Sequence, residues 1–90
     1  MPFGPESTIT GAQIRSARAA LGWSAQTLAE KSGVGLRTLM RLEQIDGVPG
    51  SRWSTMAVIR SALEAAGIEF IGSPTDGPGI RIRTLSTRSE

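Results

Sequence analysis

The stretch over residues 24–43 constrains the fold most, because its residues fit two short helices that meet at a sharp corner. Leu28 lies on the side of the first helix that the pattern predicts to be buried. Gly33 stands where the chain must leave that helix, with a positive φ that only glycine adopts cheaply. Leu39 and Leu42, three residues apart, give the second helix its own inward stripe. The other side of this second helix carries Leu36, Arg37, Met40 and Arg41.

The two helices, over 24–32 and 35–44, have the layout of a helix-turn-helix, and a further helix is predicted before them. Thr10 can cap this helix over 11–21, and Gln13 three residues later supplies the reciprocal half of a capping box. The glycine that follows residue 21 is a typical helix end.

A fourth helix is predicted to start at Ser51 or Ser54 and to stop at Gly67. The loop before it is rich in glycine and proline, which favours a turn over a continuous helix. Spacings of three and four give this helix an inner face. That face consists of Met56, Ile59 and Leu63, with Val58 and Ala62 beside them.

After Gly67 the spacing of apolar residues no longer fits a helix, and the pattern predicts a β-hairpin. Residues 68–71 and 80–84 are rich in β-branched and apolar side chains, and a turn-rich segment, 73–79, separates them. A lone hairpin is marginal in water, so it should pack on the fourth helix or pair with another chain. Edge-strand pairing through Ile80 and Ile82 makes the hairpin a candidate dimerisation element. The alternative to dimerisation is that Arg81 and Arg83 make the hairpin a wing that binds DNA phosphates.

Four segments follow from these patterns. Residues 1–8 have two prolines, a glycine and no periodicity, which predicts a flexible arm. Residues 9–67 form the helical domain, 68–84 the hairpin, and 85–90 a disordered tail.

The composition removes several classes of function. The 90 residues include no cysteine and no histidine, so the usual zinc ligands and the usual general base are missing. No run of about 18 apolar residues and no leader pattern is present, which predicts a cytoplasmic protein without a membrane segment. No motif supports catalysis or a cofactor. Only one of the ten basic residues is lysine; arginine suits phosphates and guanine, although a GC-rich genome gives the same bias.

Together these residues resemble the Xre family of Cro/C1-type helix-turn-helix regulators, over about residues 9–68, and the strands resemble a short, strand-ended branch of that family. The resemblance implies a mainly α fold, a compact four-helix, lambda-repressor-like domain followed by the β-hairpin. It rests on Ile14-Arg15, Arg18, Gly22-Trp23-Ser24, Leu28-Ala29-Glu30, Ser32-Gly33-Val34, Thr38-Leu39, Arg41-Leu42-Glu43 and the series from Ser54 to Leu63.

The resemblance also implies a sequence-specific transcriptional regulator, with repression expected, that binds double-stranded DNA as a homodimer on a palindromic operator. The helix over 35–44 would enter the major groove. The base-contacting residues that it implies are Leu36, Arg37 and Arg41. The backbone-contacting residues are Ser24, Gln26, Thr38 and Arg52. Arg18 and Glu43 match positions that form a partly buried, structural ion pair.

Three features depart from the family pattern, at Ala25, at Gly35 and on the outer face of the helix over 35–44. Ala25 stands where the family often has a phosphate-binding glutamine, and Gly35 where serine or threonine usually caps the helix. Leu36 and Met40 place apolar groups on the outer face, where they would meet a thymine methyl or a protein, unless the helix is rotated to bury them. A second hypothesis is therefore a protein-binding antiactivator or antitoxin-like adaptor with the same fold.

Two further expectations concern packing. Trp23 and Trp53 are expected in the core rather than stacked on bases, since the domain is small and needs large apolar side chains. Arg60 and Glu64, four residues apart, are expected to pair on the surface of the fourth helix.

Overall fold

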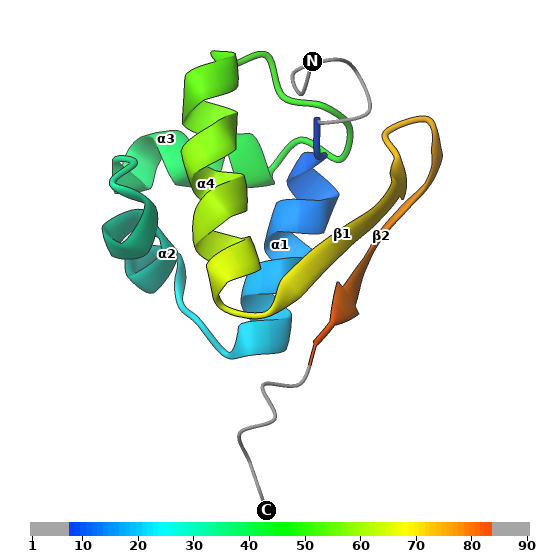
Figure 1. Ribbon diagram of the computed structural model, residues 1–90. Helices are drawn as coiled ribbons and strands as arrows, with labels where there is room; N and C mark the ends of the chain where they lie inside the picture. The colour runs from blue at the N-terminus through cyan, green and yellow to red at the C-terminus, as the bar shows by residue number, and fades with distance from the viewer. Residues whose placement is uncertain (1–7, 84–90) are drawn as a thin grey trace, which may run out of the picture.

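Four helices precede a two-stranded antiparallel sheet, as predicted (Figure 1). The computed structural model describes residues 8–83. Residues 1–7 of the predicted arm and the predicted tail lie outside the described residues. The elements are α1 (Gly11–Leu21), α2 (Ala25–Ser32), α3 (Leu36–Glu43), α4 (Trp53–Ala65), β1 (Ile68–Ser73) and β2 (Asp76–Ile82).

The ends of the first two helices follow from local chemistry. The Thr10 hydroxyl accepts from the Gln13 backbone N–H at 3.0 Å, and the Gln13 carbonyl oxygen Oε1 accepts from the Thr10 N–H at 2.8 Å. This is the capping box that the spacing predicts. Gly22 and Gly33 end α1 and α2 with φ values of 70° and 78°, where a side chain would be strained.

The core lies between the four helices and the first residue of β1. Its members are buried at spacings of three and four along α1, α3 and α4, and α2 contributes the adjacent Leu28 and Ala29. This confirms the predicted inward faces of α2, α3 and α4. The largest fully buried side chains are Ile9, Ile14, Leu28, Leu39, Leu42, Ile59 and Leu63.

The structure corrects two details of α4. The helix starts at Trp53, with Arg52 as its N-cap residue and no side-chain cap bond, so neither Ser51 nor Ser54 caps it. Val58 is exposed rather than beside the core, because it lies one residue before the buried Ile59 and about 100° around the helix.

The hairpin packs on the helices through one of its faces. The register pairs Ile68 with Ile82 and Phe70 with Ile80, so all four side chains lie on the same face. Figure 1 shows β1 and β2 running beside α1, and β1 also contacts α4. Phe70 and Ile80 pack against the core, whereas Ile82 stays 59% exposed. Ile80 therefore has a packing role within its own chain.

The strands are longer, and the turn shorter, than the composition predicts. Only residues 74–75 separate β1 from β2, because Gly72 and Gly77 have positive φ and let pairing continue past a register shift. A Cβ on Gly72 would lie 2.0 Å from the Gly77 carbonyl oxygen, so only glycine fits there.

Gln13 also ties α1 to the hairpin. Its side-chain Nε2 donates to the carbonyl oxygens of Gly79 at 2.8 Å and of Ile71 at 3.3 Å, and the residue is buried. The side-chain oxygen of Gln13 thus completes the helix cap, and its side-chain nitrogen binds two strands that are more than fifty residues away in the sequence.

We expect Gln13→Ala to lower the free energy of unfolding by about 2–3 kcal/mol, because it removes half of a capping box and takes a donor from two partly buried strand carbonyls. Urea unfolding followed by circular dichroism measures the change. Gln26→Ala is the matched control: Gln26 is exposed and bonds only Glu30 among the described residues, so its loss should stay within about 0.5 kcal/mol. Equal effects of the two substitutions would contradict the role given to Gln13.

Candidate nucleic-acid interface

The corner between α2 and α3 is fixed by hydrogen bonds and by one apolar side chain. The Gly33 N–H donates to the Ala29 carbonyl oxygen at 2.9 Å. The Ser32 hydroxyl donates to the Leu28 carbonyl oxygen at 2.8 Å and accepts from the Val34 N–H at 3.3 Å. Val34 packs against the core. These contacts leave little freedom in how α3 leaves the corner.

One side of α3 is buried and the other is presented to solvent. Leu39 and Leu42 are fully buried, whereas Arg37 and Arg41 are exposed and Met40 is 48% exposed. Arg37 and Arg41 are four residues apart and so lie on the same helical face. Leu36, predicted on this outer face, is instead half-buried and packs against the core, since it lies three residues before Leu39.

An ion pair between α1 and α3 holds α3 in place. Arg18 donates to Glu43 twice, from Nε to Oε2 at 2.9 Å and from Nη2 to Oε1 at 2.8 Å, and its Nη1 donates to the Trp23 carbonyl oxygen at 3.0 Å. The structure thus brings together the two residues predicted to pair. The hydrogen bonds to Glu43 raise the pKa of Arg18, so the guanidinium stays charged in this partly buried pair.

The arginines of residues 8–83 divide into two groups. Five are paired with carboxylates: Arg15 with Asp46, Arg18 with Glu43, Arg60 with Glu64, and both Arg81 and Arg83 with Glu69. Within the described residues, three arginines have neither a hydrogen bond nor an ion pair from their side chains, namely Arg37, Arg41 and Arg52.

Arg52 lies outside α3 but near it in the chain. It is the exposed N-cap residue of α4, where its backbone carbonyl begins the helix and its side chain makes no cap bond. The arginines without partners are therefore two residues of the outer face of α3 and one residue of the connection that follows it.

The predicted backbone-contacting residues of α2 have partners within the chain. The Ser24 Oγ accepts from the Thr27 N–H at 3.1 Å, so it serves as the helix cap. The Gln26 side chain donates to Glu30 at 3.0 Å on the exposed surface. Thr38 of α3 is half-buried.

Ala25 borders a hollow between α1, α2 and α3. The volume of this hollow is about 400 Å³. Its basic residues already bond acidic partners or carbonyl groups, so it is not a site of free positive charge. The residues around it are Arg15, Arg18, Ala25, Met40, Glu43 and Gln44.

The two tryptophans have different surroundings. Trp23 is half-buried against the core, as expected, and the Lys31 ammonium lies 5.5 Å from the centre of its ring. Trp53, also expected in the core, is instead 62% exposed and lines a pocket at the surface. It is the first residue of α4, three positions before the buried Met56, so helical spacing alone gives no sign that it turns outward.

Among residues 8–83, no three acidic side chains gather where they could hold a metal ion, and no helix has the length and apolar content needed to cross a bilayer. No protein-family model and no curated protein matches the sequence.

Proposed function

We propose that the protein is a sequence-specific DNA-binding regulator, in which α2 and α3 act as a helix-turn-helix and α3 enters the major groove. The observation that carries this proposal is the placement of the arginines without partners. Five arginines of residues 8–83 are neutralised by carboxylates, and the three that are not lie on α3 or directly after the loop that follows it.

The chemistry of these residues fits the two parts of DNA recognition. Arg37 and Arg41 share the exposed face of α3, and each guanidinium can donate two hydrogen bonds to the O6 and N7 acceptors of a guanine. Arg52 fits a phosphate contact, which positions the protein without reading sequence. The Arg18–Glu43 pair supports the proposal indirectly, because a helix that reads bases must be held rigidly.

One copy of the domain contacts too few base pairs for useful selectivity. Two copies on a palindromic operator, with half-sites about 34–36 Å apart, would double the contacts. We therefore propose that the protein acts as a homodimer.

Selection from a library of random DNA duplexes, followed by titration of the selected duplex in a salt series, tests this function. We expect binding whose affinity falls steeply with salt, since each neutralised phosphate contributes about −0.9 to the slope of log K against log salt. Arg52→Ala should reduce the magnitude of this slope by about 1. Arg81→Ala is the matched control, because Arg81 already pairs with Glu69 at 3.1 Å and should change the slope little.

If no sequence is enriched and no duplex binds at low salt, the proposal is wrong. An effect of Arg81→Ala as large as that of Arg52→Ala would favour the phosphate-binding wing.

A protein-binding adaptor is the second candidate, and the exposed thioether of Met40 favours it. Met40 lies next to Arg41 on the outer face of α3 and also borders the hollow beside Ala25. Methionine adapts to irregular apolar partners. Met40→Glu would abolish binding of a protein ligand through this face, and it would also weaken DNA binding, so the salt series is what separates the two functions.

A further inference from the structure

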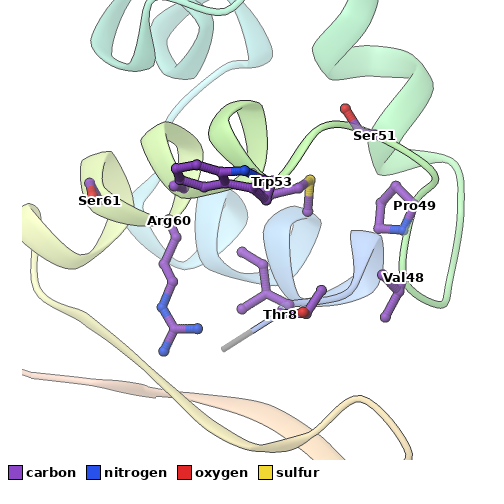
Figure 2. A pocket seen from close by; sticks show the side chains of 10 residues that line it. Thr8, Val48, Pro49, Ser51, Trp53, Arg60 and Ser61 are labelled. Carbon is purple, nitrogen blue, oxygen red and sulfur yellow. The ribbon is translucent and has the colours of Figure 1, made fainter. Parts of the chain in front are cut away.

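A pocket opens between α4 and the loop that leads into it (Figure 2). Its volume is about 530 Å³, which is in the range of pockets that bind small molecules. Figure 2 shows the indole of Trp53 on the α4 side, Val48 and Pro49 on the loop side, and Thr8 between them. The buried Met56 also lines the pocket.

The pocket leaves apolar surface in contact with water. Trp53 is 62% exposed and Val48 is 45% exposed, whereas the adjoining Pro49 is buried. An aromatic side chain between the indole and the loop would remove this surface from water and could stack on the indole. The pocket therefore fits an apolar occupant that contains an aromatic ring.

The chain supplies a tethered segment at the edge of this pocket. Thr8 is the first described residue and is itself part of the lining, so residues 1–7 join the chain there. An extended chain spans about 3.3–3.6 Å per residue, so the five residue steps from Phe3 to Thr8 can reach across the pocket. A segment attached this closely has an effective concentration in the millimolar range, far above that of a separate molecule.

The residue types of this segment match those of the pocket. Phe3 is its aromatic side chain, and two prolines reduce the entropy that ordering would cost. Glu6 is the charged side chain of residues 1–7, and Arg60 is the charged side chain of the pocket lining. Arg60 stands at the rim, with its guanidinium 5.3 Å from the Phe70 ring and its Nε bonded to Glu64 at 2.9 Å.

We infer that residues 1–7 occupy this pocket in their own chain, with Phe3 against Trp53 and Glu6 beside Arg60. The docked segment covers the start of α4 and the loop that connects it to α3. This inference uses no residue of the outer face of α3, so it stands or falls independently of DNA binding.

Fluorescence of Trp53 tests the inference. In a Trp23→Phe background Trp53 is the sole tryptophan. There, Phe3→Ala should shift the Trp53 emission to longer wavelength, increase its quenching by acrylamide, and lower the melting temperature by about 4–8 °C. The indole N–H signal of Trp53 in NMR spectra of the otherwise unchanged chain gives a second readout, which does not depend on the Trp23 substitution.

Phe3→Ala in a Trp53→Ala background is the matched control, and the melting temperature should change little there because the partner ring is already gone. An unchanged Trp53 emission and N–H signal after Phe3→Ala would overturn the inference. A change that appears only at protein concentrations where light scattering shows a dimer would also overturn it, in favour of a second copy in the pocket.

Discussion

Gly11→Ala is expected to have the largest effect on stability of any conservative substitution in the helices. A Cβ at this position would lie 1.9 Å from the Ile45 carbonyl oxygen and 2.4 Å from that of Leu42. Both are backbone atoms at the end of α3, so they cannot move aside as a side chain can. The Gly11 N–H also donates to the Gly47 carbonyl oxygen at 2.9 Å, which fixes α1 against this backbone.

Relief of this overlap requires α1 to separate from the end of α3, and we expect a loss of about 3 kcal/mol or more in the free energy of unfolding. In a chain of 90 residues that loss is a large part of the total stability. Urea unfolding measures it. Gly50→Ala is the matched control, since Gly50 has an ordinary φ and open space around it. Wild-type stability of Gly11→Ala would contradict the close approach of α1 and α3.

Arg37→Ala and Arg41→Ala are expected to have the largest effects on DNA binding. Each substitution removes a guanidinium that has no partner among residues 8–83, so the folded protein loses no internal contact of that group. If each arginine bonds a guanine, each loss costs about 1–3 kcal/mol of discrimination, and the double variant should bind the selected duplex about a hundredfold more weakly or worse.

The affinity for duplexes of unrelated sequence should fall much less, because there the arginines contribute only charge. Titration of both kinds of duplex with each variant measures the difference, and the melting temperature of the double variant should match that of the unchanged protein. Equal losses for both kinds of duplex would assign these arginines to phosphates instead.

The parts of the fold that the sequence predicts are those set by local chemistry. The Thr10 and Gln13 pair encodes the start of α1, and Gly22 and Gly33 encode the ends of α1 and α2, because a cap or a positive φ requires particular residue types. The inward face of α3 follows from the spacing of leucines in the same way.

Features that depend on distant residues could not be predicted. No periodicity shows that Trp53 faces a pocket, since its position also fits the inner face of a helix. The bonds from Gln13 to the strands join segments that have no sequence relation. Of the candidate site, the Arg18–Glu43 and Arg60–Glu64 pairs could be predicted from the sequence. The pairing of Arg15 with Asp46, and of Arg81 and Arg83 with Glu69, became known only from the positions of those carboxylates.

We propose that Arg37 and Arg41 of α3 read guanines in the major groove. Replacing single guanines of the selected duplex with 7-deazaguanine removes the N7 acceptor and leaves the charge and shape of the DNA nearly unchanged. We expect particular guanines at which this replacement weakens binding of the unchanged protein about tenfold. At those guanines it should have no further effect on the variant that lacks the contacting arginine. If no guanine responds, or if the variants respond as strongly as the unchanged protein, α3 does not read the major groove through these residues.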